Sequence, residues 1–284
     1  MTDDSSAQGP NGIDRRQLLA LLLAGNSVSA DEQQHDPLCN NLLWAVAWKQ
    51  TAAEYLALCH QAYNLARLRV DMAIAGTRAN DKPLAVITDV DDTILHAGSY
   101  WGYLIRQNRD FFDDSIWDAW LPNNQVTPAP GALSFFRYCH ERNIEVFYVT
   151  SRDQGERTFE YALSQLRALK FPFADESHLY VFRDTSDKTP ARLEIEKRFR
   201  LAVMLGDNLN DFRRDYYVKD VDERRALMER DHDRWGSEFI LLPNPTDGHW
   251  VRAIFGDSEP APTDANRRLL RQAAMRVAWD GGNP

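Results

Sequence analysis

The chain has 284 residues, with 33 lysines and arginines against 42 aspartates and glutamates, which gives a formal net charge of −9. Hydrophobic residues make up 44% of it and aromatic residues 11%, a composition that indicates a globular protein and excludes a wholly disordered or fibrous one. An acidic chain lacks the basic surface that polymeric nucleic acids require, so we expect any anionic partner to be a small molecule.

The N-terminal segment has the pattern of an export signal. Arg15 and Arg16 precede the apolar run 18–25, and Val28 and Ala30 occupy the recognition positions of a cleavage site. The run is shorter than the ~20 residues that span a bilayer, so we expect no stable membrane anchor. We predict a signal peptide over 1–30, loosely similar to a twin-arginine signal, and a periplasmic or secreted protein. A cytoplasmic protein with a short amphipathic N-terminal helix is the alternative.

Residues 31–80 are predicted to form a helical extension. Apolar residues recur at steps of three and four from Leu42 to Met72, without proline or glycine, which predicts one continuous amphipathic helix. Such a helix packs on the core or against a second copy, so a homodimer is one expectation.

From Pro83 onward, short apolar runs end in polar residues and alternate with helical segments. The runs cover 84–88, 144–149, 179–182, 201–205 and 239–242, and helices are expected near 132–142, 154–169 and 190–198. This alternation predicts an α/β fold with a Rossmann-like parallel sheet covered on both faces. We place this core at 81–257, with an irregular, aromatic-rich lid inserted at about 94–130, and a C-terminal tail with a helix at 258–284.

Acidic residues follow two of the predicted strands, where a parallel sheet binds its ligands. Asp89, Asp91 and Asp92 follow the first strand, and Asp207 and Asp211 follow the run 201–205. Carboxylates crowded at one edge repel one another unless a cation neutralises them, and their hard oxygens suit Mg²⁺. A solvated acidic turn is the simpler alternative. A calcium loop of the EF-hand type does not fit, because its glycine and glutamate positions hold Ile94 and Tyr100.

Groups that bind phosphate follow two further strands. Thr150 offers a hydroxyl beside loop amides, and Lys188 offers a positive charge before a helix. With the acids, they supply the groups needed for phosphoryl transfer through an aspartyl-phosphate. In that reaction Asp89 attacks phosphorus, while Asp91 protonates the leaving oxygen and later activates water.

The strand-end motifs resemble the four motifs of the haloacid dehalogenase superfamily. They are Asp89-Val90-Asp91-Asp92-Thr93, Thr150, Lys188 and Gly206-Asp207-Asn208-Leu209-Asn210-Asp211. The flanking segments 48–55, 61–64, 130–132, 147–152, 206–212 and 242–245 look like those of bacterial class C acid phosphatases. Those proteins are exported, nonspecific phosphomonoesterases, of which many are lipoproteins and some act as 5′-nucleotidases. The resemblance covers roughly residues 44–255.

The resemblance implies a role for each motif residue. Asp89 is the nucleophile and Asp91 the general acid and base. Mg²⁺ is held by the Asp89 carboxylate, the Asp91 backbone carbonyl and Asp207, with Asp211 in support. The phosphoryl oxygens are held by Thr150, Ser151 and Lys188. Two departures are visible: Ser151 stands where the family often has asparagine, and no lipid-attachment cysteine is present.

Three aromatic residues, Tyr100, Trp101 and Tyr216, are predicted to line the substrate pocket, where a ring could stack on a nucleobase; packing within the lid is the alternative for each. We therefore expect a Mg²⁺-dependent acid phosphatase for small phosphomonoesters, with nucleoside 5′-monophosphates as candidate substrates. A phosphatase for sugar or other metabolite phosphates is one alternative. A catalytically inactive secreted binding or storage protein is another.

Overall fold

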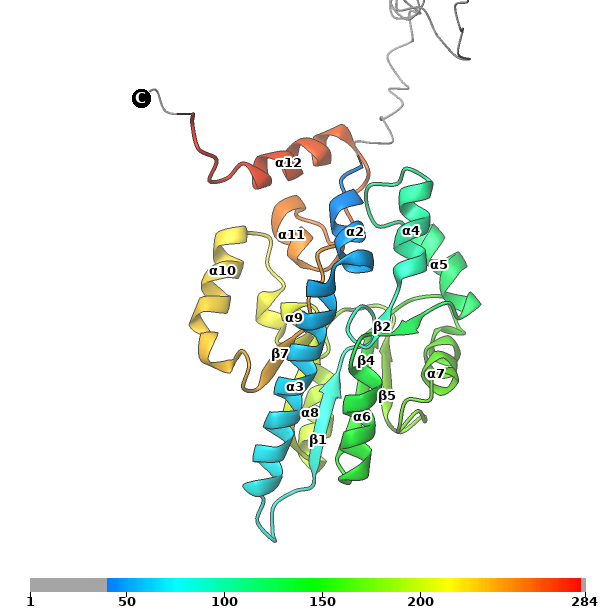
Figure 1. Cartoon of the computed structure of the whole chain (residues 1–284), viewed down its shortest axis with the longest axis vertical. Coiled ribbons are helices and arrows are strands. Elements are labelled where there is room, and N and C mark those ends of the chain that lie inside the picture. The colour runs from blue at the N-terminus through cyan, green and yellow to red at the C-terminus, as the bar shows by residue number, and fades with distance from the viewer. Residues whose placement is uncertain (1–39, 282–284) are drawn as a thin grey trace, which may run out of the picture. The chain divides into compact units, whose positions relative to one another are not determined.

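The computed structural model describes residues 40–281, so the predicted signal peptide lies outside the described residues. A parallel sheet in the order β5-β4-β1-β6-β7 forms the centre (Figure 1). The bounds are β1 Leu84–Thr88, β4 Glu145–Ser151, β5 Leu179–Phe182, β6 Arg200–Gly206 and β7 Phe239–Leu241. All five strands lie where the apolar runs predicted them, and the predicted α/β fold is confirmed.

The first strand explains why these runs are almost continuously apolar. Val86 packs in a cluster with helices α3 (Ala53–Ala75), α6 (Ala132–Glu141) and α7 (Thr158–Ala168). Its neighbours Ala85 and Ile87 belong to a second cluster with α8 (Thr189–Arg198) on the opposite face. Because successive side chains of a strand point to opposite faces, a sheet covered on both sides needs apolar residues at every position.

The predicted continuous helix from Leu42 to Met72 is wrong at Ala52. The structure has two helices, α2 (Leu43–Thr51) and α3, and Ala52 between them is extended, with ψ 126°. The α3 helix buries its apolar stripe against the sheet, whereas α2 turns to pack beside α4 (Gly98–Arg106). Gln50 donates to the Gly98 carbonyl at 2.9 Å across that contact. Tertiary packing thus overrides a sequence that favours helix throughout.

The segment predicted as an irregular lid contains regular structure. It holds α4, α5 (Asp114–Trp120) and a short antiparallel pair of strands, β2 (Leu95–His96) and β3 (Thr127–Pro128), which brings the two ends of the segment together. Its aromatic side chains pack on one another: the ring centroid of Tyr100 lies 5.0 Å from those of both Trp101 and Trp117. These contacts give the segment an aromatic core of its own.

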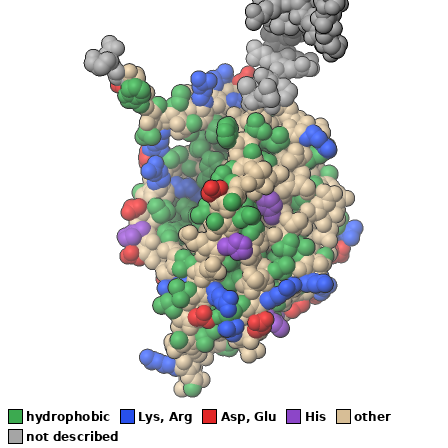
Figure 2. Space-filling model, in the orientation of Figure 1, with side chains coloured by type: hydrophobic (Ala, Val, Ile, Leu, Met, Phe, Trp, Pro, Cys, Tyr) green, Lys and Arg blue, Asp and Glu red, His purple; other side chains and the backbone are tan. Residues whose placement is uncertain are grey.

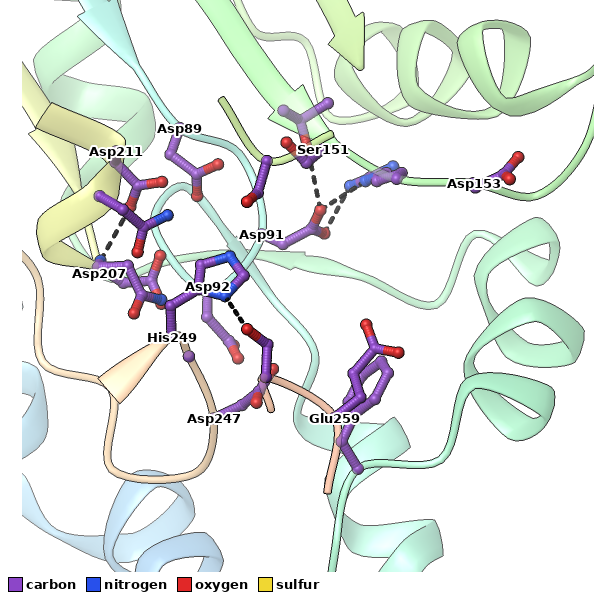
Figure 3. Close-up of a pocket in the computed structure, with 18 of the residues that line it drawn as sticks. Asp89, Asp91, Asp92, Ser151, Asp153, Asp207, Asp211, Asp247, His249 and Glu259 are labelled. Atoms are coloured by element: carbon purple, nitrogen blue, oxygen red, sulfur yellow. Dashed lines mark hydrogen bonds and ion pairs between the residues drawn. The ribbon is translucent and has the colours of Figure 1, made fainter. Parts of the chain in front are cut away.

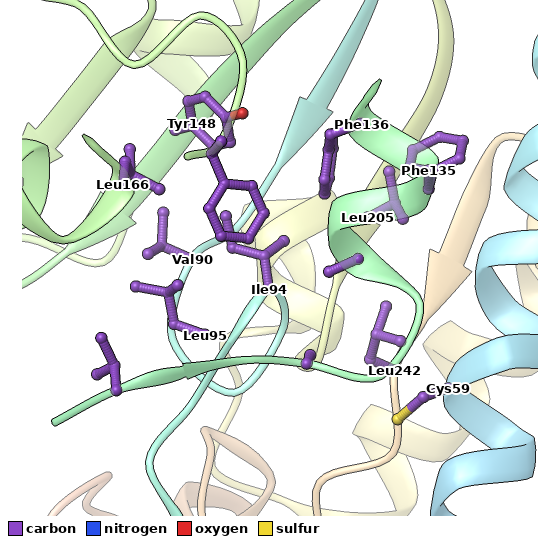
Figure 4. Packing of buried hydrophobic residues seen from close by; sticks show 14 of the residues in the cluster. Cys59, Val90, Ile94, Leu95, Phe135, Phe136, Tyr148, Leu166, Leu205 and Leu242 are labelled. Carbon is purple, nitrogen blue, oxygen red and sulfur yellow. The ribbon is translucent and has the colours of Figure 1, made fainter. Parts of the chain in front are cut away.

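The turn that follows β1 is rooted in the main core. Val90, Ile94 and Leu95 are buried and point into the apolar cluster, near Tyr148 and Leu166 (Figure 4). The polar residues between them therefore cannot move far without disturbing the core. This anchoring holds the apolar residues of the turn in the core, and the carboxylates between them are oriented by their own polar contacts.

The remaining α-helices follow β6 and β7. They are α9 Leu209–Phe212, α10 Val221–Arg230, α11 Trp250–Phe255 and α12 Asp264–Ala274. No helix within residues 40–281 is long and apolar enough to cross a membrane. On the face shown in Figure 2, lysine and arginine side chains are interspersed with aspartate and glutamate.

Candidate active site

The predicted site residues meet at the carboxyl edge of the sheet. Asp89 follows β1, Thr150 lies near the end of β4 and Asp207 follows β6, and all three line one cavity of about 700 Å³. Figure 3 shows Asp89, Asp207 and Asp211 together on one side of this cavity, with Asp247 and Glu259 on the other. The parallel sheet produces this convergence because neighbouring strands end at the same edge.

Asp89 is buried and held through both carboxylate oxygens. Thr93 donates to its Oδ2 at 2.8 Å and also reaches Asp207 Oδ1 at 3.1 Å. Lys188 donates to Asp89 Oδ1 and, at 2.7 Å, to Asp211 Oδ1. The Thr93 hydroxyl and the Lys188 ammonium therefore join the three carboxylates of Asp89, Asp207 and Asp211 in one hydrogen-bonded network.

The carboxylates of this network suit a divalent cation. One oxygen each from Asp89, Asp207 and Asp211 lies within 4.8 Å of the others. Burial raises the pKa of Asp89 to about 6, with Lys188 opposing the rise and Asp211 and Asp91 adding to it. Burial, with the charges of Asp211 and Asp89, also raises the pKa of Asp207 well above its ordinary range. Hard oxygen donors crowded in this way fit Mg²⁺, which would favour their ionised forms.

Lys188 remains a cation in this setting. Burial acts to lower its pKa, but the carboxylates of Asp211 and Asp89 raise it above the ordinary value of a lysine. A buried ammonium paired with two carboxylates is a fixed positive charge facing the cavity.

The Asp91 carboxylate points away from the three clustered acids. It is paired with Arg152, whose Nε lies 2.5 Å from Oδ2 and whose Nη2 lies 2.6 Å from Oδ1. Thr150 Oγ1 also donates to Oδ2, at 3.2 Å. The carboxylate of Asp91 is thus not part of the acid cluster, so any metal contact from Asp91 falls to its backbone carbonyl.

The predicted phosphate-binding residues all line the cavity. Thr150 is buried, and Ser151 donates through Oγ to the Thr185 carbonyl at 3.1 Å. In this structure both hydroxyls are thus held by protein acceptors. Lys188, just before α8, lines the same cavity.

Only one of the three predicted pocket aromatics lines the cavity. Trp101 does so and donates through Nε1 to Asp92 Oδ2 at 3.2 Å. Tyr100 is fully buried in the aromatic core beside α5, and Tyr216 is fully buried with its hydroxyl donating to Asp231 at 2.7 Å. The prediction of a pocket role for Tyr100 and Tyr216 is therefore corrected. Three other rings line the cavity, those of Phe112, Trp117 and Tyr217.

Acidic side chains also border the outer part of the cavity. Burial raises the pKa of Asp247 to about 6, and burial together with Asp114 raises the pKa of Glu259 to about 7. His249 lies nearby, with Nδ1 2.7 Å from Ser258 Oγ, and burial lowers its pKa to about 4. At neutral pH this histidine is uncharged and does not offset the acids.

Two polar contacts of the site were not anticipated. Asn244, after β7, donates to Asp207 Oδ2 at 2.7 Å. Lys49, on α2, lies 2.9 Å from Asp92 Oδ1. Both residues lie in segments that resemble the phosphatase family, Lys49 in 48–55 and Asn244 in 242–245. Lys49 also follows Val46 by three residues, which places it on the buried side of its helix.

Comparison with known proteins agrees with this geometry. A sequence model of the HAD superfamily, subfamily IIIB (Acid phosphatase), matches residues 26–250. The chain belongs to this acid phosphatase subfamily. Its structure is similar to that of the class C acid phosphatase from Bacillus anthracis with tungstate bound, with a TM-score of 0.77 and 26% identity over 86% of this chain and 100% of that chain. A second structure of the class C acid phosphatase from Bacillus anthracis, 23% identical over 86% of this chain and 99% of that chain, has the same fold with a TM-score of 0.74.

The predicted membership of the class C acid phosphatases is thus confirmed, and the protein is a phosphomonoesterase of the HAD superfamily. Enzymes of this superfamily typically use a divalent metal, and the acid phosphatase described here has a carboxylate cluster able to hold one.

Proposed function

We propose that this acid phosphatase hydrolyses small phosphomonoesters through a Mg²⁺-dependent transfer of the phosphoryl group to Asp89. The observation that carries the proposal is the setting of Asp89. It is buried at the base of the cavity, and its two carboxylate oxygens are fixed by Thr93 and Lys188. A carboxylate held in one orientation beside a fixed positive charge suits attack on a phosphorus atom.

The reaction has two chemical steps. In the first, an Asp89 oxygen forms a bond to phosphorus, the bond from phosphorus to the leaving oxygen breaks, and Asp91 gives that oxygen a proton. In the second, Asp91 takes a proton from a water molecule, whose oxygen attacks phosphorus and releases phosphate from Asp89. Lys188, Thr150 and Ser151 hold the phosphoryl oxygens throughout.

The metal site proposed for this reaction uses the Asp89 carboxylate, the Asp91 backbone carbonyl and Asp207, with Asp211 in support. When bound, Mg²⁺ would supply positive charge against the phosphoryl oxygens and the clustered acids. Asn244 and Thr93 keep Asp207 oriented, since they donate to its two oxygens at 2.7 and 3.1 Å.

Nucleoside 5′-monophosphates are the proposed substrates among the small phosphomonoesters. A cavity of about 700 Å³ has room for such a ligand, and the rings that line it offer apolar area to a base. The net charge of −9 and the acidic outer cavity support a small anion over a polymeric nucleic acid.

Export is proposed on the leader alone. The basic pair, short apolar run and cleavage pattern within residues 1–30 support a periplasmic or secreted enzyme. Sequencing the N-terminus of the mature protein after cell fractionation tests this: a start near residue 31 in the exported fraction supports it, and an intact leader in the cytoplasm contradicts it.

The function is tested by hydrolysis of a substrate panel after chelation. The enzyme is treated with EDTA, dialysed and assayed with nucleoside 5′-monophosphates, sugar phosphates and p-nitrophenyl phosphate, with and without added Mg²⁺. We expect activity to vanish on chelation, to return with Mg²⁺ and to be highest for the nucleotides. Activity that does not change on chelation would contradict the proposed dependence on Mg²⁺. Higher activity on sugar phosphates than on nucleotides would contradict the proposed substrate.

A further inference from the structure

Lys49 is a charged residue that the proposed chemistry does not use, yet it is among the most deeply buried charged groups near the site. It lies on α2, and its side chain is 2% exposed. Its ammonium lies 2.9 Å from Asp92 Oδ1, 3.0 Å from Thr246 Oγ1 and 3.2 Å from Asn244 Oδ1. Thr246 Oγ1 and Asn244 Oδ1 accept hydrogen bonds from the ammonium, and Asp92 Oδ1 is its ion-pair partner. No group of the described residues donates a hydrogen bond to that buried carboxylate oxygen, so its charge depends on the ion pair with Lys49.

These partners lie in two segments of the site: Asp92 in the turn after β1, and Asn244 and Thr246 in the loop between β7 and α11. Asp92 is in the turn after β1, directly beside Asp91, and has a left-handed backbone conformation with φ 53°. Its other oxygen accepts from Trp101 at 3.2 Å and from Asn244 at 3.4 Å. Asn244 in turn donates to Asp207. One ammonium therefore joins the acidic turn, the cavity wall and the loop that orients Asp207.

We propose that Lys49 is a positioning residue of the active site, through which helix α2 holds the acidic turn in its working conformation. The left-handed backbone at Asp92 is less favourable than a right-handed one for any residue other than glycine, so contacts of the Asp92 side chain help to hold the turn in this conformation. Without Lys49, Asp92 would be a buried carboxylate with no cation, and the turn would shift to hydrate it. Asp91, the preceding residue in the chain, would move with it.

The test compares Lys49→Met with Gln50→Leu, a matched control on the same helix. Gln50 also ties α2 to α4, through the Gly98 carbonyl, but it has no contact with the turn. The first measurement is hydrogen exchange of the backbone amides at 89–95, which needs neither substrate nor metal. We expect exchange to quicken by at least about tenfold in Lys49→Met and to stay at the parent rate in Gln50→Leu.

The second measurement is kinetic and rests on the proposed function. With p-nitrophenyl phosphate, Lys49→Met should lose about 10- to 100-fold in kcat, as expected when an outer support of a metal site is removed, with KM changed much less. The double variant Lys49→Met with Asp92→Asn removes the unpaired charge, so it should recover part of the lost kcat and slow the exchange again. A role in packing alone would give no such recovery.

The outcomes separate cleanly. Parent-like exchange at 89–95 and a kcat within twofold of the parent in Lys49→Met would overturn the proposal. If Lys49→Met does not fold, the double variant decides: a folded and active double variant supports the proposal, and an unfolded one overturns it. If the parent itself hydrolyses no ester, the proposed function fails while the exchange measurement still tests Lys49.

Discussion

Arg152 holds both carboxylate oxygens of Asp91, with Nε 2.5 Å from Oδ2 and Nη2 2.6 Å from Oδ1. The remaining guanidinium nitrogen, Nη1, donates to Gln165 Oε1 at 2.7 Å, and Gln165 donates to the Leu121 carbonyl at 2.9 Å. The proposed general acid is therefore oriented by a buried chain of contacts that ends at the segment between β1 and α6.

The orientation of Asp91 predicts the effect of Arg152→Lys. A lysine keeps the charge but lacks the planar fork that grips two oxygens. We expect kcat to fall by about tenfold or more, as a part of the 10²–10⁴ that a positioned general acid supplies, with a smaller change in KM. Arg183→Lys is the matched control, since Arg183 lines the same cavity but pairs with Asp153. Equal effects of the two substitutions on kcat would count against the role of Arg152.

Lys188→Met should remove the fixed charge that faces the phosphoryl group. The ammonium contacts Asp89 and Asp211, and no neighbouring cation of the described site contacts both. We expect kcat/KM to fall by about 10² or more and inhibition by inorganic phosphate to weaken, because loss of one preorganised donor costs about that much. Lys82→Met, at a lysine that donates to the Glu196 carbonyl, serves as control. Unchanged phosphate inhibition in Lys188→Met would show that Lys188 does not bind phosphate.

Asp247→Asn predicts a pH-dependent gain in stability. Burial raises the pKa of Asp247 from 3.8 to about 6, so its contribution to stability is full below pH ~4 and is lost as pH rises through 6. The asparagine variant lacks this loss. The free energy of unfolding of the variant relative to the parent should therefore rise between pH 4 and pH 7, by at most about 3 kcal/mol. Urea unfolding at both pH values measures it; a difference that is the same at pH 4 and 7 would be inconsistent with a raised pKa.

The two buried tyrosines are expected to affect stability and not substrate choice. Tyr216→Phe removes the hydrogen bond to Asp231, and Tyr100→Phe removes the contacts with the Asp113 backbone. Each should lower the free energy of unfolding by about 1 kcal/mol and leave the ranking of substrates by kcat/KM unchanged. Trp101→Leu, which alters the cavity wall, should change that ranking. A changed ranking of substrates in either variant would show that the tyrosine does affect substrate choice, against this prediction.

The sheet was predictable because burial on both faces leaves a direct trace in the sequence. A strand such as 84–88 must be apolar at every position, and an acid cluster directly after it then marks the ligand edge. Because Asp89 and Asp207 each follow an apolar strand, the sequence also predicted that they would meet at one edge of the sheet. They line one cavity, although 118 positions separate them (207 − 89). The apolar pattern and the acids that follow it are therefore enough to predict the sheet and the position of the site at its edge.

Other features depend on contacts that leave little trace in the sequence. Ala52 is as good a helix former as its neighbours, and only the packing of α2 beside α4 explains the break there. Tyr100 and Trp101 are adjacent, yet one is enclosed by rings and the other faces the cavity. The direction of each side chain follows from the placement of α4 and α5, which sequence periodicity does not give.

The role of Asp89 is the central claim, and Asp89→Asn tests it most directly. Asparagine keeps the size of the side chain but removes the charged nucleophile, so turnover of p-nitrophenyl phosphate should fall by about 10⁴-fold or more, with the melting temperature retained. Asp184→Asn, at an exposed acid of the same cavity, should keep parent activity. Mass spectrometry of the enzyme quenched in acid during turnover should find a phosphoryl group on Asp89 in the parent and none in Asp89→Asn. Parent-like turnover by a folded Asp89→Asn enzyme would contradict the account.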